Sequence, residues 1–206
     1  YVVGAFSGST RIGGILLNAV GRTDSFVAKF AADGTPSWVN RFGGLDQDYA
    51  YAVRVGPSGA AYVAGYFRGT GTFGSSVLQS AGGYDAYLLR IEPDGQLTWA
   101  VRAGGTEDDY AKAVLAPDDS ALYLAGHFRG AATFGSSALA SSGRDDAFLA
   151  RVNAADGAFQ WARFMGGSGS DRAYALTDDG EGGVVAAGRF EETAYFGQHS
   201  LISSGY

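Results

Sequence analysis

The 206-residue chain contains no cysteine, a single methionine and four prolines, and only 17% of its residues are charged. Without cysteine there is no disulfide framework and no thiolate zinc site. No apolar run reaches the roughly 18 residues of a membrane helix, so we expect no membrane insertion by this segment. Because 15 lysines and arginines stand against 21 acidic residues, we also expect no binding to the phosphates of a nucleic acid.

Glycine and apolar residues are abundant instead. The chain has 33 glycines, 14% aromatic residues and 46% hydrophobic residues. Such a composition disfavours disorder. The glycines follow no Gly-X-Y period, which excludes a collagen helix.

An internal repeat of 61 to 62 residues organises the chain. The tripeptide Gly-x-Phe marks it four times, beginning at Gly4, Gly65, Gly126 and Gly188. Tryptophan keeps the same period, at Trp38, Trp99 and Trp161, and a Gly-Gly pair follows each tryptophan by five residues. Two series of aspartates do so as well: Asp24, Asp85 and Asp146, then Asp48, Asp109 and Asp171. A period of this length indicates a repeat architecture.

Each repeat is predicted to hold four short strands and no helix. In the second copy, runs rich in aromatic and β-branched residues lie at 49–55, 61–67, 85–91 and 97–103, separated by glycine, proline and aspartate. The second and third runs are joined by a long glycine- and serine-rich connection, where an extra hairpin fits, and the other turns are tight. Four antiparallel strands repeated at a near-constant length are typical of β-propeller blades.

We therefore predict an all-β protein, a β-propeller of four-stranded antiparallel blades forming one segment of about three and a third blades. The units are expected at 1–44 (last three strands), 45–105, 106–167 and 168–206 (first two strands). Propellers typically close with four to eight blades, so this incomplete arc should not close alone. We expect it to associate with the rest of the same propeller or with other copies of the chain; open stacking of the repeats, as in a solenoid, is the alternative. The start at Tyr1, with the one methionine at Met165, predicts a processed product or part of a longer chain.

Several motifs of the repeat carry a family resemblance. They are FG-x-x-x-L, then G-[GR]-x-D-[AS]-[FY]-[VL]-x-[KR], then DG-x-x-x-W-x-x-x-x-GG-x-x-x-D-x-A-x-A-[VL], together with [AL]-Y-[VL]-AG-x-F. Over essentially the whole chain they resemble the bacterial SBBP-type β-propeller repeat. The first copy departs from the pattern at Ile12 and Ser25. The resemblance implies a propeller, often in secreted or cell-surface bacterial proteins, and no catalytic residue, cofactor or defined ligand.

Residues present in every copy are predicted to be structural. Trp38, Trp99 and Trp161 are expected to pack between neighbouring sheets. Asp24, Asp85 and Asp146, like Asp48, Asp109 and Asp171, are expected to accept backbone N–H bonds, with calcium binding as the alternative. No metal site is favoured, because the third copy reads Ser168-Gly169-Ser170 where the others have acidic residues. Lys29, Arg90 and Arg151 are expected to form salt bridges with one aspartate series; a cation-lined face is the alternative.

Residues that vary between copies are the candidates for binding. Tyr66, Arg68, His127, Arg129 and Arg189 lie at or just beyond the second strand of their units, near the long connection. In the first strands, Tyr51, Lys112 and Tyr174 share one position, and Tyr49, Tyr110 and Arg172 another. Such side chains could form a contact patch for a protein or a glycan. Plain solvent exposure is the alternative.

No catalytic motif is present. The two histidines occupy unrelated repeat positions, and no G-x-S-x-G or phosphate-binding loop occurs. We therefore predict no catalytic residue, no cofactor and no enzyme activity, but a binding, structural or self-assembling module of a larger secreted or cell-surface bacterial protein. The alternative is part of a propeller enzyme acting on extracellular polysaccharide, with catalytic residues outside this segment or in the channel loops. The near-uniform copies favour the first.

Overall fold

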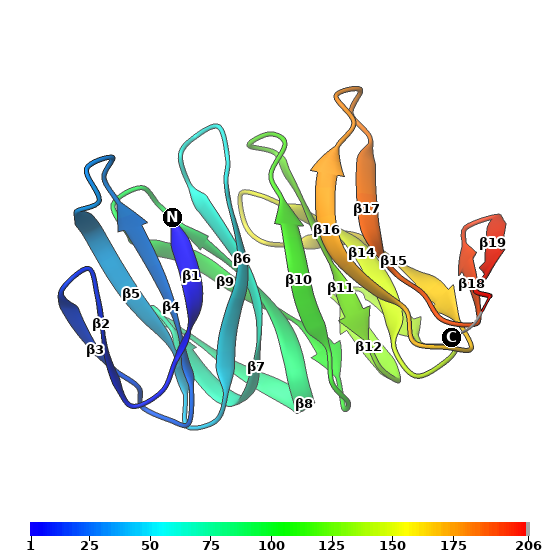
Figure 1. The fold of residues 1–206 in the computed structure, drawn as a ribbon, viewed down its shortest axis with the longest axis horizontal. Helices are drawn as coiled ribbons and strands as arrows, with labels where there is room; N and C mark the ends of the chain where they lie inside the picture. Colours follow the sequence, from blue (N-terminus) through cyan, green and yellow to red (C-terminus); the bar gives the residue numbers. More distant parts are fainter. Residues whose placement is uncertain (205–206) are drawn as a thin grey trace.

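The computed structural model describes residues 1–204 and confirms the all-β prediction. Within these residues there is no helix, and all pairs of named strands are antiparallel. The strands follow the repeat, and Figure 1 shows the resulting sheets arranged one after another along the molecule.

The second, third and fourth units each begin with a strand that lies beside the equivalent first strand of its neighbour, whereas the first unit begins with the second strand of the repeat. The first unit contains β1 (Val2–Phe6), β4 (Asp24–Phe30) and β5 (Pro36–Gly44). The second contains β6 (Asp48–Val55), β7 (Ala61–Phe73), β8 (Ser76–Ile91) and β9 (Leu97–Gly105). The third contains β10 (Tyr110–Leu115), β11 (Ala121–Phe128), β14 (Asp146–Asn153) and β15 (Phe159–Gly167), and the fourth β16 (Arg172–Asp178) and β17 (Val184–Arg189).

The extra hairpin expected in the long connection is confirmed. It is formed by β2 (Ser9–Ile12) with β3 (Ile15–Asn18), β12 (Ala131–Phe134) with β13 (Ser137–Ala140), and β18 (Thr193–Phe196) with β19 (His199–Ile202). In the second unit the hairpin continues β7 and β8 without a break in the strands, so both are longer than the sequence indicates.

From the second unit onward, the first strand of each hairpin pairs with the Gly-Gly residues of the preceding unit. Gly104 and Gly105 of β9 pair with Thr133 and Ala132 of β12, and the other junctions repeat this pairing. A Cβ added to Gly105 would lie 1.8 Å from the carbonyl oxygen of Ala131. The second glycine of the pair is therefore required by the close approach of the two backbones.

The core lies between the stacked sheets. Tyr62 and Leu88 of the second unit pack with Leu122 and Phe148 of the third in the largest cluster. An equivalent cluster joins the first and second units, whereas that between the third and fourth consists mainly of alanines and leucines. Because side chains of both neighbours are needed to bury each cluster, the units stabilise one another.

Tight turns and long connections lie at opposite edges of the sheets. Figure 1 shows the turns β4–β5, β6–β7, β10–β11 and β16–β17 along the upper edge. The crossings from one unit to the next run along the lower edge. The first strands β6, β10 and β16 lie side by side, and the candidate binding residues are found on them, on β7, and at the ends of β11 and β17.

Candidate functional site

The side-by-side strands β6, β10 and β16 carry different side chains at the same positions of the repeat. Tyr49 lies opposite Tyr66 of β7, with ring centroids 5.0 Å apart, and Tyr110 lies opposite His127 of β11 at 4.9 Å. In the fourth unit the two equivalent positions, on β16 and β17, are occupied by Arg172 and Arg189. The cross-strand pair thus changes from two stacked aromatic rings to two cations along the molecule.

Lys112 of β10 lies in a cage of three tyrosines from two units. Its Nζ is 3.9 Å from the ring centroid of Tyr51, 4.4 Å from that of Tyr66 and 5.1 Å from that of Tyr110. These are cation–π contacts. Among residues 1–204 no carboxylate forms an ion pair with Lys112. Burial, with a smaller contribution from Arg172, lowers the pKa of Lys112 to about 8, so the ammonium is the main form at pH 7.

The tyrosines of this cage are themselves held by their neighbours. The ring of Tyr66 forms T-shaped pairs with the rings of Tyr110 and Tyr84, with ring centroids 4.7 and 5.5 Å apart. The Tyr84 hydroxyl donates to Gln47, and the Tyr110 hydroxyl donates to Asp108 at 3.2 Å. Burial raises the pKa of Tyr66 to about 12, which keeps its hydroxyl protonated. The cage therefore presents neutral rings to the ammonium.

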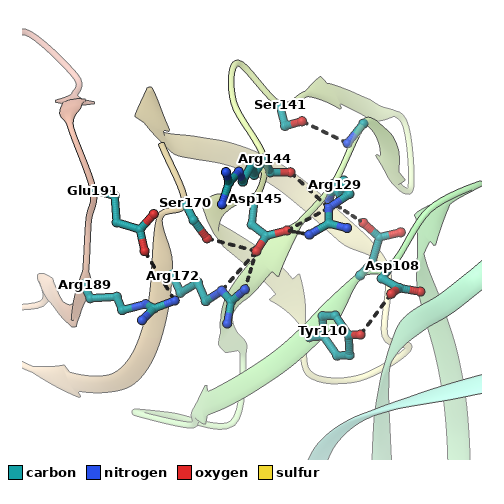
Figure 2. Close-up of polar contacts among 12 residues, drawn as sticks. Asp108, Tyr110, Arg129, Ser141, Arg144, Asp145, Ser170, Arg172, Arg189 and Glu191 are labelled. Carbon is teal, nitrogen blue, oxygen red and sulfur yellow. Dashed lines mark hydrogen bonds and ion pairs between the residues drawn. The ribbon is translucent and has the colours of Figure 1, made fainter. Parts of the chain in front are cut away.

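Asp145 links two arginines beside the cage (Figure 2). Its side chain accepts hydrogen bonds from Arg129 Nε at 2.9 Å, from Arg172 Nε at 3.1 Å and from Ser170 Oγ at 3.0 Å. Asp145 is 4% exposed. Burial alone would raise its pKa, but the bonds from Arg172, Arg129 and Ser170 together lower it. The carboxylate is therefore ionised and fully engaged at neutral pH.

His127 is buried against the same cluster, with 4% of its surface exposed. Its ring stacks on Tyr110, and its Nδ1 has no hydrogen-bond partner among the described residues. Burial, followed by the charge of Arg172, lowers its pKa to about 3. The imidazole is neutral at physiological pH.

These groups surround a pocket of about 260 Å³, which we call the inner-strand pocket. Its wall includes Tyr51, Lys112, His127, Arg129, Asp145 and Tyr174. Three of the five residues predicted for binding thus lie together: His127 and Arg129 in the wall, and Tyr66 beneath Lys112. Arg68 and Arg189 are not part of this wall; both are exposed, and Arg189 lies 3.6 Å from Glu191.

Sequence reasoning did not place Lys112 and Asp145 at the centre of the site. A signal was present, because Lys112 stands where the neighbouring units have Tyr51 and Tyr174. Asp145 likewise stands where the others have Thr23 and Tyr84. Each is a charged residue at a position that is uncharged elsewhere in the repeat.

The repeated residues lie away from this pocket, at the junctions between units. Trp38 and Trp99 donate Nε1–H to the carbonyls of Pro93 and Ala154 in the next unit, at 3.1 and 3.2 Å. Trp161 lies beside Tyr123 of its own unit.

The second aspartate series binds the backbone at each crossing. The carboxylates accept the N–H of the second glycine of the Gly-Gly pair at 2.7 to 2.8 Å in all three cases: Asp48 from Gly44, Asp109 from Gly105 and Asp171 from Gly167. Burial raises the pKa of Asp48 to about 6 and that of Asp109 to about 7. Residues 1–204 contain no group of three potential ligands placed to hold a metal ion.

The expectation that strand cations pair with the repeated aspartates was wrong. Lys29 and Arg90 instead donate to the carbonyls of Pro93 and Ala154 in the next unit, because they lie near the far ends of β4 and β8, away from Asp24 and Asp85. Arg151 forms no ion pair with any described residue. The buried carboxylates of Asp24, at the start of β4, and Asp85, within β8, pair with Arg41 and Arg102 from the following strand.

The third unit departs from this pairing. Asp146 accepts the backbone N–H of Ser142 at 2.8 Å. The equivalent arginine, Arg163, is exposed and donates to the carbonyl of Ala162.

Comparison with known proteins gives one partial similarity. No family model matches the chain. A stretch of 73 residues, 35% of the chain, is 41% identical to part of "Regulatory protein FlaEY" from Caulobacter vibrioides, and it covers 8% of that protein. Within the described residues no helix is long and apolar enough to span a membrane.

Proposed function

We propose that the chain is a non-catalytic binding module, built as a segment of a β-propeller, that recognises its ligand with the inner-strand pocket. Four-stranded antiparallel units in repeat order, with their first strands side by side, support the propeller arrangement. The SBBP-type repeat pattern supports a place in a larger secreted or cell-surface bacterial protein. The match to a small part of a much longer bacterial regulatory protein is compatible with such a modular role.

The observation that carries this proposal is the contrast between repeated and unrepeated buried polar groups. The aspartates at the junctions recur in every unit and bind the backbone. Lys112, His127 and Asp145 occur once each at their repeat positions, yet are half-buried or buried. Burying such groups opposes folding, and the neighbouring units fold without them. Groups of this kind are typical of functional sites.

Catalysis receives less support than binding. Asp145, one of the two carboxylates in the pocket wall, has a lowered pKa and is engaged by two arginines, so it is poorly suited to proton transfer at neutral pH. The aspartate whose pKa is near neutral, Asp109, is buried at the crossing and binds the backbone of Gly105.

The proposed propeller also needs partners at its ends. Beyond β17 no further strand pairs with its free edge in the described structure, and Val185 on this strand is 51% exposed. Unpaired strand edges are sites of association. We propose that other units of the same protein, or another copy of the chain, continue the arc here.

A ligand screen with paired tyrosine variants tests the binding function. The purified chain is applied to immobilised glycans and peptides, followed by the Tyr51→Ala and Tyr195→Ala variants. Both tyrosines are more than half exposed, but Tyr195 lies on the β18–β19 hairpin, away from the pocket. We expect Tyr51→Ala to weaken binding about tenfold, as for a residue at the centre of a binding site.

The control variant Tyr195→Ala should bind like the unchanged chain, with near-ultraviolet circular dichroism confirming that both variants fold. Failure to find any ligand, or equal losses in the two variants, would contradict the proposed function.

A further inference from the structure

The inner-strand pocket has a net positive charge on an acidic chain. Its wall holds the cations Lys112, Arg129 and Arg172 and the carboxylates Asp108 and Asp145. With His127 neutral, one positive charge is left over, whereas the whole chain carries −6. The two arginine charges are balanced by Asp145, which pairs with both, and by Asp108, whose charge acts on Arg129, so the uncompensated charge is that of Lys112.

The aromatic cage cannot serve as a site for a cationic ligand. The Nζ of Lys112 already lies over the rings of Tyr51, Tyr66 and Tyr110. A second cation would be repelled by this ammonium and by Arg172. The rings hold Lys112 in place, and its remaining N–H donors suit an anion.

Two half-exposed tyrosines flank Lys112. Tyr51 on β6 is 52% exposed and Tyr174 on β16 is 41% exposed, and both line the pocket on the strands next to β10. Their rings offer flat apolar surfaces on either side of the charge, with polar groups close by. A sugar ring, with apolar C–H faces and hydroxyls at its rim, matches this combination better than an acidic peptide side chain does.

His127 and the volume of the pocket restrict the class of ligand further. The buried imidazole lines the pocket, and its Nδ1 lacks a hydrogen-bond partner among the described residues. A buried polar atom normally has a partner, which a ligand hydroxyl can provide. The volume of about 260 Å³ is below the roughly 300–1,000 Å³ of drug-sized sites, and so fits one small ring.

We propose that the inner-strand pocket binds a carboxylate-bearing sugar residue, with the carboxylate at Lys112 Nζ and the ring against Tyr51 or Tyr174. This inference rests on the proposed binding function and names its ligand class. The uncaged side of the ammonium supplies the charge contact, and the tyrosines supply the contact with the ring.

The two lysines of the chain, Lys29 and Lys112, allow a direct test. Chain labelled with ¹³C at lysine Cε is titrated at constant ionic strength with D-glucuronate, with D-glucose and with a short glutamate-containing peptide. We expect glucuronate to shift the Lys112 signal to saturation and leave the Lys29 signal unmoved. Glucose and the peptide should bind at least about tenfold more weakly.

Matched variants complete the experiment. Lys112→Met keeps an apolar chain of similar length in the cage and should lose about tenfold or more in glucuronate affinity, while Lys112→Arg should retain part of it and Lys29→Met all of it. Equal binding of glucose and glucuronate, or no effect of Lys112→Met, would overturn the anionic ligand but leave the proposed binding function standing. Tighter binding of the peptide would overturn the sugar class. Loss of all binding in the glycan and peptide screen would instead remove the proposed function itself.

Discussion

The junctions between units and the inner-strand pocket are built from the same repeat but use it in opposite ways. At the junctions, Asp48 and Asp109 occupy equivalent positions and make the same bond to a glycine N–H. The residue that follows the aspartate makes a different contact in each unit. Tyr49 stacks on Tyr66, Tyr110 stacks on His127, and Arg172 donates to Asp145. Under the proposed function, the repeat separates stability, which every unit must supply, from recognition, which one group of strands can carry.

The largest expected effect comes from a buried aromatic residue of the junctions. Phe134 is fully buried, with its ring 4.6 Å from that of Phe148. Phe134→Ala should lower the free energy of unfolding by about 3–5 kcal/mol, because it leaves a cavity between the sheets. Ile12 stands at the same repeat position in the β2–β3 hairpin but is half-buried, so Ile12→Ala should cost about 1 kcal/mol. Guanidinium denaturation measures both, and similar losses would contradict the account of the core.

A second prediction concerns the pH dependence that the junction aspartates impose. Burial raises the pKa of Asp109 from 3.8 to about 7, so the fold favours its neutral form. This contribution to stability is fully present below pH 3.8 and is lost as the pH rises through about 7. Between pH 5 and pH 7, Asp109 should remove about 2 kcal/mol from the free energy of unfolding.

The Asp109→Asn variant isolates this effect. Its stability should fall less than that of the unchanged chain over the same pH range, whatever its absolute value. Thermal unfolding at several pH values measures the two slopes, and parallel slopes would show that Asp109 is ionised in the fold.

Two arginines at one repeat position give a smaller contrast. Arg102 pairs with the fully buried carboxylate of Asp85, whereas Arg163 is exposed and, among residues 1–204, its side chain bonds only the carbonyl of Ala162. Arg102→Met should cost about 1–2 kcal/mol, a moderate value because the guanidinium itself is partly solvated. Arg163→Met should stay within about 0.5 kcal/mol of the unchanged chain. Equal effects in urea denaturation would refute the assignment of the ion pair.

The smallest contrast lies in the Asp-Gly turns. Gly34 and Gly157 both have positive φ, at 85° and 75°, so alanine is strained at either position. A Cβ at Gly157 would also lie 2.9 Å from the ring of Trp99, whereas a Cβ at Gly34 meets no atom within 4 Å. Gly34→Ala should cost about 1 kcal/mol and Gly157→Ala about 1 kcal/mol more. Matching shifts in melting temperature would exclude a role for the tryptophan contact.

Much of the fold could be predicted from the sequence because turns and strands are local features. The period, the tight turns and the hairpin of the long connection all follow from glycine placement and from runs of aromatic and β-branched residues. The continuous β7 and β8 could not be predicted, because glycines such as Gly71 and Gly82 interrupt the pattern there although the backbone stays extended.

The site was less predictable because its contacts cross from one unit to another. His127 and Arg129 could be chosen as residues that vary within the repeat. The cage around Lys112 could not, since Tyr51 and Tyr66 belong to the second unit and Lys112 to the third. For the same reason, Lys29 and Arg90 were matched to aspartates of the repeat rather than to carbonyls of the next unit.

An amide NMR titration of the folded chain with D-glucuronate tests the central claim most directly, because it reports on the proposed recognition surface and on the junctions at once. We predict that shift changes gather on β6, β10 and β16 and at residues 127–129, while the amides of Gly44, Gly105 and Gly167 stay unmoved. Shift changes confined to the β2–β3, β12–β13 or β18–β19 hairpins, or spread evenly over the junction glycines, would contradict the separation of recognition from stability.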